Sequence, residues 1–377
     1  MKKDPEIRSR ISVLVVDDSA FMRIALARMI GSDPDLQVAG TACDGTDALE
    51  KIVSLDPDVV TLDIEMPKLS GIETLRCIMD KWPRPVIMVS ATTENSAEIS
   101  FKALGAGAFD YVAKRLSPNS LDIPHIQSEL IAKIKGAAQS VRSHSASRVP
   151  RKPPQAASAS EGHVFPVMPE SVTPDSVTLG SVTPGVVAIG ISTGGPKALE
   201  EILPLFPQDL SVPLLIVQHM PPGFTAPFAQ RLNALCSVQV REATHGEIVY
   251  PGVVYIAPSG IHMTVERRSA SRTAICLTSH PENCPHTPSI DVMMQSVAAA
   301  FHGLAMGVIM TGMGADGALG MKAIRREGGL TVGQDEASSA VYGMPRVCAE
   351  SGVLQRVLPL SEIPPYIVQA TRHYMRA

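Results

Sequence analysis

Short apolar runs that alternate with helical patterns constrain the fold of this chain more than any other feature. In the N-terminal half the runs lie at 11–16, 36–42, 57–62, 85–90 and 109–113. Helical patterns follow them at 19–31, 44–55, 72–81, 96–104 and 125–139. Repeated strand, helix, strand units form a parallel sheet with helices on both faces. Because the chain repeats this order from residue 186, we expect two α/β domains, each a doubly wound parallel sheet.

A change of composition separates the two halves. Residues 141–184 are rich in Ser, Pro, Val and Thr, and Ser-Val-Thr recurs in SVTPDSVTLGSVTPG. Prolines exclude a continuous helix there, at Pro153, Pro154, Pro166, Pro169, Pro174 and Pro184. Such low-complexity sequence is typical of a linker. We therefore predict one domain at 1–140, a linker at 141–184 and a second domain at 185–377.

Overall charge and hydropathy exclude several classes of protein. A net charge of −4 provides no general attraction to nucleic acid or anionic lipid. No apolar run is long enough to cross a bilayer, and the charged start lacks the apolar stretch of a signal peptide. The six cysteines form no C-x-x-C pair. We expect a cytoplasmic protein with no nucleic-acid partner and no membrane insertion.

Polar residues follow the strands of the first domain at one edge of its sheet. Asp17 and Asp18 come after the first strand, Asp63 ends the third, Ser90 ends the fourth and Lys114 follows the fifth. Each aspartate alone is readily explained as a helix cap or turn residue. Three carboxylates at one edge repel one another unless a cation offsets them, and oxygen ligands favour Mg²⁺. The pattern therefore indicates a metal-assisted phosphoryl-acceptor site at Asp63.

The segments VVDDSAFMR, TLDIEMPKLSGIE, MVSATTE and GAFDYVAKR resemble the receiver domain of two-component response regulators, a flavodoxin-like (βα)5 fold. The resemblance implies that a chemotaxis histidine kinase phosphorylates Asp63. It implies roles for the following residues: Asp18, Asp63 and the backbone carbonyl of Glu65 hold Mg²⁺, Asp17 supports it through water, Ser90 and Lys114 contact the phosphoryl group, and Tyr111 changes rotamer. One departure is Arg115, where the family usually has proline.

A candidate nucleophile opens the second domain. Gly190, Ser192 and Gly194 fit G-x-S-x-G after a strand and before a helix with an early proline. This context presents a serine hydroxyl near the backbone N–H groups of a helix N-terminus. A structural tight turn is the alternative. A dinucleotide loop is disfavoured because the spacing misses G-x-G-x-x-G.

A nucleophilic serine needs a base, and the base needs an orienting group. His219 ends the apolar strand LLIVQ at the edge where Ser192 lies, and His262, after VVYIAPSGI, is the reserve candidate. Asp316 lies in a glycine-rich turn after the strand LAMGVIM. Its competitor, Asp291, is better placed to open or cap a helix. Histidines in polar or loop-like segments are weaker candidates: His245, His280, His286 and His302.

The segments GISTGGPKAL, IVQHMPPGFTAPFAQRL, VYIAPSGIHM and VIMTGMGADGALGM resemble chemotaxis protein-glutamate methylesterases, which have a Rossmann-like catalytic domain. The resemblance implies Ser192 as nucleophile, His219 as general base and acid, and Asp316 as orienting carboxylate. It also implies the Met313 backbone as oxyanion donor. Because an ester needs little help with its leaving group, we expect one serine site without a metal in this domain. Thr287 departs from the family, which commonly has arginine there.

The function expected from these residues is hydrolysis of glutamyl methyl esters on methyl-accepting chemotaxis receptors, with release of methanol, and deamidation of receptor glutamines. The receiver is expected to cover the Ser192 cleft until Asp63 is phosphorylated. A transcriptional regulator is disfavoured because the second half has no basic recognition helix. A non-enzymatic adaptor that drains phosphoryl groups from the kinase stays open as an alternative.

Overall fold

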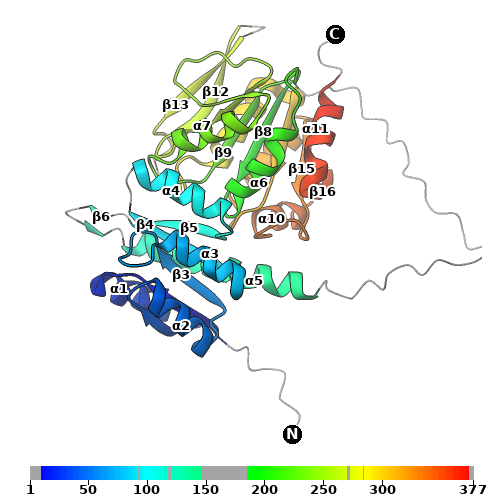
Figure 1. The fold of residues 1–377 in the computed structure, drawn as a ribbon. Coiled ribbons are helices and arrows are strands. Elements are labelled where there is room, and N and C mark those ends of the chain that lie inside the picture. Colours follow the sequence, from blue (N-terminus) through cyan, green and yellow to red (C-terminus); the bar gives the residue numbers. More distant parts are fainter. Residues whose placement is uncertain are drawn as a thin grey trace, which may run out of the picture.

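A computed structural model of the chain describes residues 10–91, 94–114, 116–117, 120–121, 123–146, 185–269, 272–282 and 284–372. Two α/β domains account for these residues (Figure 1). The predicted linker lies largely outside the described residues, at 147–184, as does the Arg115 departure. The last helix of the first domain continues past residue 140 to Ala146.

The first domain contains one parallel sheet of order β2-β1-β3-β4-β5. Its strands are β1 (Ile11–Val16), β2 (Leu36–Ala42), β3 (Val59–Asp63), β4 (Val86–Ala91) and β5 (Asp110–Lys114). Its helices are α1 (Ala20–Gly31), α2 (Gly45–Leu55), α3 (Gly71–Lys81), α4 (Glu94–Gly105) and α5 (Ile123–Ala146). A short antiparallel pair, β6 (Leu116–Ser117) and β7 (Ser120–Leu121), precedes α5. This strand order is the flavodoxin-like order, as expected.

Local signals explain where these helices begin. Ser19 and Asp44 accept hydrogen bonds from the first turns of α1 and α2. Ser70 and Glu73 form a capping box at the start of α3. In α1 the apolar residues Met22, Leu26, Met29 and Ile30 are buried, and the helix ends at Gly31, before its C-cap Ser32.

The second domain contains a parallel sheet of order β10-β11-β9-β8-β14-β15-β16. Its strands are β8 (Val186–Ile191), β9 (Leu214–Gln218), β10 (Gln239–Glu242), β11 (Val253–Ile256), β14 (Ala305–Ile309), β15 (Leu330–Gln334) and β16 (Arg356–Leu358). Strands β9, β11 and β10 lie on one side of β8, and β14, β15 and β16 lie on the other. The point where the order reverses lies between β8 and β14, and such a crevice is where α/β sheets place their sites.

Helices cover both faces of this sheet. The α-helices are α6 (Gly195–Ile202), α7 (Thr225–Leu235), α8 (Ile290–Phe301), α9 (Ala318–Arg326), α10 (Met344–Glu350) and α11 (Ile363–Thr371). Short 3₁₀ turns are η1 (Leu203–Leu205), η2 (His302–Leu304) and η3 (Leu360–Glu362). The two sheets and their helices bury the apolar runs that predicted them. The predicted fold class is confirmed for both domains.

An antiparallel hairpin, β12 (His262–Ser269) and β13 (Arg272–Thr278), packs beside the second sheet against α8. The sequence interpretation placed His262 directly after a strand at 253–261. That placement is wrong, because β11 stops at Ile256 and His262 begins the separate hairpin. The apolar pattern suggested one strand through residue 261. Pairing with β13 instead makes His262 the first residue of a separate strand, β12.

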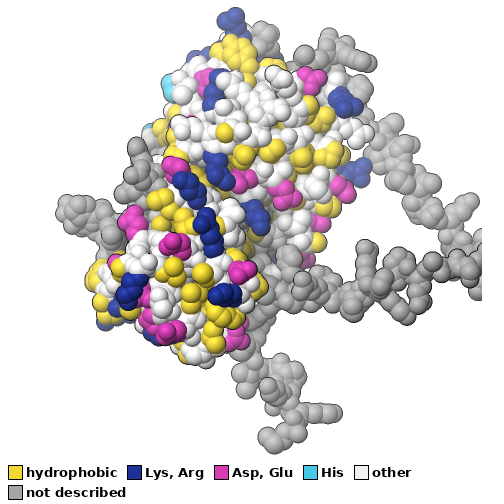
Figure 2. Space-filling model, viewed as in Figure 1, with side chains coloured by type: hydrophobic (Ala, Val, Ile, Leu, Met, Phe, Trp, Pro, Cys, Tyr) yellow, Lys and Arg dark blue, Asp and Glu magenta, His cyan; other side chains and the backbone are white. Residues whose placement is uncertain are grey.

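The first domain lies against the second through α4, β5 and α5 (Figure 1). Basic and acidic side chains are interspersed on the face shown in Figure 2, with no large area of one sign. Within the described ranges, no helix combines the length and apolar character needed to cross a bilayer.

Candidate functional site

The loop after β8 presents Ser192 at the crevice between β8 and β14. Gly194 has a φ of +76°, a left-handed conformation that favours glycine, and it turns the chain into α6. The Ser192 N–H donates to the Thr311 carbonyl after β14 at 3.0 Å. The Thr311 hydroxyl donates to the Thr193 carbonyl at 2.9 Å. These buried bonds hold the loop against β14, so the Ser192 side chain has a defined position.

Three predicted residues meet at this crevice. His219 follows β9, and its Nδ1 lies 3.1 Å from Ser192 Oγ. Its Nε2 lies 2.9 Å from Asp316 Oδ2. Because a carboxylate only accepts, Nε2 carries the proton and Nδ1 is left to accept from the serine hydroxyl. The ring is therefore turned relative to the usual serine-protease triad, in which Nε2 faces the serine.

Asp316 is held in place by the N-terminus of α8. It accepts hydrogen bonds from the Ser289 hydroxyl at 2.9 Å, the Ile290 N–H at 2.8 Å and the Asp291 N–H at 3.0 Å. Burial alone would raise the pKa of Asp316, but His219 and these amide donors lower it to about 2. The carboxylate is thus ionised and fixed at neutral pH.

This pKa predicts a stability effect at acid pH. The folded-state pKa of Asp316 is about 2, below its usual 3.8, so its ionisation stabilises the fold by about 2 kcal/mol above the unfolded-state pKa. That contribution is lost as the pH falls from about 4 to about 2. The difference in unfolding temperature between wild type and Asp316→Asn should therefore shrink over this range. A difference that stays constant to about pH 3 would contradict the assignment.

The competing residues have other contacts. His262 is fully buried, its Nδ1 accepts from the Ser289 N–H at 3.0 Å, and its Nε2 lies 3.2 Å from the Pro281 carbonyl. Asp291 lies in the first turn of α8 and accepts from the Gly320 N–H at 2.7 Å. Both side chains connect structural elements around the site.

Two residues of the site were not singled out from the sequence. His286 stacks on His219 with ring centroids 4.2 Å apart, although its loop setting made it a weak candidate. The Gln218 amide donates to the carbonyls of Ser192 and His219, each at 3.0 Å, and so ties the two loops together. A Cβ on Gly195 would lie 1.9 Å from Gln218 Oε1, which explains the second glycine of the loop. Gln218 could have been found from the sequence, because it is a polar residue at the end of the apolar strand LLIVQ.

Met313 lies in the loop after β14, beside this group. Among the described residues, its N–H donates to no partner, whereas the neighbouring Gly312 N–H is bonded to the Val341 carbonyl. Both Met313 and Thr287 are exposed and line the cavity that contains Ser192. An N–H without an acceptor at this place is available to a developing oxyanion.

The acidic residues of the receiver also come together. Carboxylate oxygens of Asp17, Asp18 and Asp63 lie within 4.8 Å of one another. Lys114 contacts Asp17 and Asp63, each at 2.7 Å. Asp18 is exposed while the other two carboxylates are buried, so the cluster opens to solvent on one side. This oxygen donor set fits Mg²⁺.

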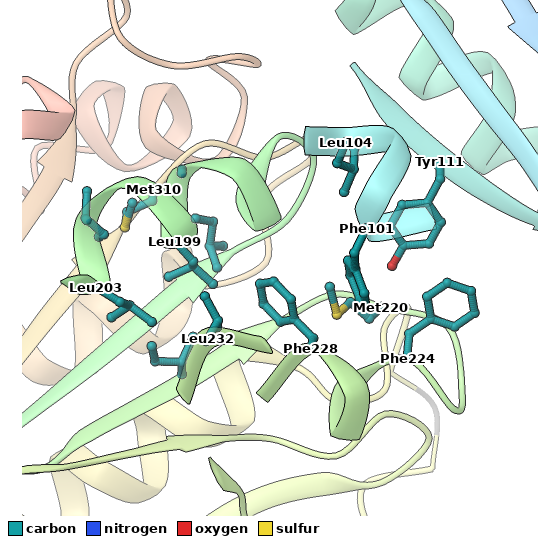
Figure 3. Close-up of a cluster of buried hydrophobic side chains, with 14 of the residues drawn as sticks. Phe101, Leu104, Tyr111, Leu199, Leu203, Met220, Phe224, Phe228, Leu232 and Met310 are labelled. Carbon is teal, nitrogen blue, oxygen red and sulfur yellow. The ribbon is translucent and has the colours of Figure 1, made fainter. Parts of the chain in front are cut away.

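The other residues singled out in the first domain differ in burial and position. Burial, aided by Asp17 and opposed by Lys114, raises the pKa of Asp63. Ser90 is buried near the end of β4, next to β3 in the sheet. Glu65 is exposed in the loop after β3. Tyr111 is buried on β5, and its ring lies beside Phe101 and Phe224 in the contact with the second domain (Figure 3).

Aromatic side chains form the centre of that contact. Phe101 of α4 stacks on Phe228 of α7 at 5.2 Å between centroids and meets Phe224 edge-on at 6.2 Å. Tyr111 stacks on Phe224 at 5.0 Å. Figure 3 shows these rings together with Met220, which follows His219. The receiver therefore packs directly beside the Ser192 site.

A polar contact lies next to the aromatic one. Asp110 of β5 accepts a hydrogen bond from the Gly194 N–H at 3.3 Å. Lys133 of α5 contacts Asp110 at 3.2 Å and Glu129 at 2.9 Å. A carboxylate of the first domain therefore bonds to the backbone of Gly194, two residues after Ser192.

The fold and the two sites are those of a receiver joined to a serine hydrolase of the doubly wound α/β class. Residues 13–123 match the response regulator receiver domain, and residues 187–367 match the CheB methylesterase domain. The chain therefore belongs to the CheB methylesterase family, as its similarity to curated relatives also shows.

Two such relatives are named protein-glutamate methylesterase/protein-glutamine glutaminase. The one from Geobacter sulfurreducens is 43% identical over 94% of this chain and 96% of its own length. The one from Pyrococcus horikoshii is 43% identical over 97% of this chain and 95% of its own length. The solved CheB methylesterase catalytic domain of Thermotoga maritima is 36% identical, with a TM-score of 0.48, over 50% of this chain and 99% of its own.

Proposed function

We propose that this chain is a phosphorylation-activated serine esterase that hydrolyses glutamate methyl esters on methyl-accepting chemotaxis receptors and deamidates receptor glutamines. The observation that carries the proposal is the hydrogen-bonded series from Ser192 through His219 to Asp316 at the crevice of the second sheet. The relatives' name and the receiver support the choice of substrate and of control.

The geometry suits two-step acyl transfer. Ser192 Oγ attacks the ester carbonyl carbon while its proton moves to His219 Nδ1, and Asp316 stabilises the imidazolium through Nε2. The Met313 N–H stabilises the oxyanion. Collapse of the tetrahedral intermediate releases methanol, which takes the proton from His219. Water then attacks the acyl group, gives a proton to His219 and restores Ser192 with release of the glutamate. For a glutamine the leaving group is ammonia.

Control would come from the receiver. A chemotaxis histidine kinase transfers a phosphoryl group to Asp63, and Lys114 and Ser90 contact it. Asp18, Asp63 and the backbone carbonyl of Glu65 would hold Mg²⁺, which when bound offsets the negative charge of this site. Tyr111 connects this site to the domain contact, because its ring packs on Phe224. A rotamer change of Tyr111 would remove that stacking and favour an open arrangement.

The test is methanol release from radiolabelled methylated receptor membranes, with and without a small-molecule phosphodonor and Mg²⁺. We expect release that rises with the phosphodonor and depends on Ser192. A fully phosphorylated protein that releases no methanol would contradict the esterase proposal and favour the adaptor.

The aromatic contact predicts a variant with raised basal activity. Phe101→Ala removes a ring that packs on Phe224 and Phe228, and such central aromatic contacts are commonly worth about 2 kcal/mol. We expect basal receptor hydrolysis to rise by up to about 30-fold, the equivalent of that energy. Phe21→Ala on α1, whose side chain is 62% exposed, is the matched control. Equal basal rates in the two variants would show that this contact does not restrain the enzyme.

A further inference from the structure

The catalytic groups are already assembled while the receiver is docked. Ser192, His219 and Asp316 are joined at 3.1 and 2.9 Å in the same structure in which Phe101 packs on Phe228. The Met313 N–H has no acceptor among the described residues. Docking therefore leaves the machinery for acyl transfer intact, and any inhibition must act on access.

Docking also leaves a space over the nucleophile. A cavity of about 660 Å³ lies between the domains, with Ser192, His219 and Met313 in one wall and Tyr111 and Lys133 in the other. Cavities of this size hold small organic ligands. The space is large enough for an ester the size of a single amino-acid derivative.

The cavity opens at one rim. Its lining includes exposed residues of both domains, Ser128 of α5 on one side and Pro285, His286 and Thr287 on the other. Met313, beside the nucleophile, is 37% exposed. A small molecule can therefore reach Ser192 without separation of the domains.

A helix is too large for the same space. With side chains a helix is about 10–12 Å across, so two turns displace roughly 850–1,200 Å³. This exceeds the cavity of about 660 Å³. The cavity therefore admits a glutamyl ester on a small molecule more readily than the same ester carried on a receptor helix.

The charge of the receiver wall determines which small esters the cavity favours. Lys133 faces Asp110 and Glu129, so the receiver wall carries two carboxylates for one ammonium. Burial acts to lower the pKa of Lys133, but the two carboxylates raise it overall, so the ammonium is charged. The net negative wall favours neutral or cationic esters over anionic ones.

We propose that the docked, unphosphorylated enzyme hydrolyses small neutral methyl esters through this cavity at a rate that phosphorylation scarcely changes. The inference rests on the proposed esterase function. The ester C–O bond breaks after attack by Ser192 Oγ, methanol leaves with the proton held by His219, and water releases the acid. Ester and water thus give acid and methanol with no other reactant.

The experiment uses the full chain and two substrates, the γ-methyl ester of N-acetyl-glutamyl N-methylamide and methylated receptor membranes. Each is assayed with and without a phosphodonor and Mg²⁺, with Ser192→Ala as the blank. We expect kcat/KM for the small ester to stay within about twofold, while receptor hydrolysis rises about tenfold or more.

Three other outcomes have distinct meanings. Small-ester hydrolysis that rises with the phosphodonor as steeply as receptor hydrolysis would overturn the inference, because docking would then disable the chemistry. Hydrolysis of receptor esters alone would also overturn it and leave the proposed function standing. Hydrolysis of neither substrate in either state would contradict the proposed function and the inference with it.

A variant at the rim tests whether small esters reach Ser192 through this opening. Ser128→Trp places a large side chain at the receiver side of the opening and leaves the second domain unchanged. We expect small-ester hydrolysis without phosphodonor to fall several-fold and to recover with it. Gln139→Trp, at an exposed position of α5 that does not line the cavity, is the matched control. An unchanged small-ester rate in Ser128→Trp would contradict access through this rim.

Discussion

Replacement of Ser192 by alanine is expected to lower kcat for methyl-ester hydrolysis by about 10⁶-fold, the usual cost of removing a serine nucleophile. No other hydroxyl is bonded to His219 Nδ1 in the described residues, so no substitute nucleophile lies in place. The change removes one oxygen, and the backbone bonds of residue 192 to Thr311 and Gly195 stay. Methanol release and glutamine deamidation should be lost together, since both use the same acyl-enzyme.

Ser128→Ala is the matched serine control. Ser128 lines the same cavity on the receiver side and plays no part in acyl transfer. Its esterase activity should remain close to that of wild type. A Ser192→Ala protein that retains more than about one hundredth of wild-type kcat would show that another group is the nucleophile.

Asp316→Asn is expected to lower kcat by about 10⁴-fold with little change in KM. The carboxylate accepts from His219 Nε2 at 2.9 Å, which leaves Nδ1 free to take the serine proton. An asparagine amide directed at Nε2 donates instead, which places the ring proton on Nδ1. The nitrogen that faces Ser192 then has no lone pair for the hydroxyl proton.

The rate and the ring tautomer can be measured separately. Steady-state kinetics give kcat and KM, and ¹⁵N NMR of His219 reports which ring nitrogen is protonated. Asp291→Asn is the control, because its side chain accepts from the Gly320 N–H and does not contact His219. A similar loss of kcat in both variants would indicate general disruption around α8.

Local sequence patterns were sufficient to predict most strands and helices of the fold. The apolar runs of the receiver became β1 to β5, and Ser19 and the Ser70–Glu73 capping box start α1 and α3, because a strand period and a capping side chain act within a few residues. Residues 253–262 show where prediction from local patterns fails. Whether a strand continues or a hairpin begins depends on pairing with β13, which lies further along the chain.

The site also combines features that local sequence predicts with features that depend on contacts distant along the chain. Ser192, His219 and Asp316 were predictable because each follows a strand at the carboxyl edge of one sheet. The orientation of the His219 ring was not, since it follows from the amide donors of α8 that fix Asp316. Gln218 and His286 act through contacts with loops distant in sequence, for which a single sequence has no period or motif.

By itself the sequence determined two parallel α/β sheets, the acidic edge of the first and the serine loop of the second, because short-range patterning specifies strands, turns and caps. Only the tertiary structure decided how the receiver docks, which ring nitrogen faces Ser192 and that a cavity stays open above it. The ring orientation depends on the amide donors that fix Asp316. The docking and the cavity depend on the packing of Phe101, Tyr111 and Phe224 and on the volumes left between the domains. Packing of this kind is set by three-dimensional shape, which no local spacing records.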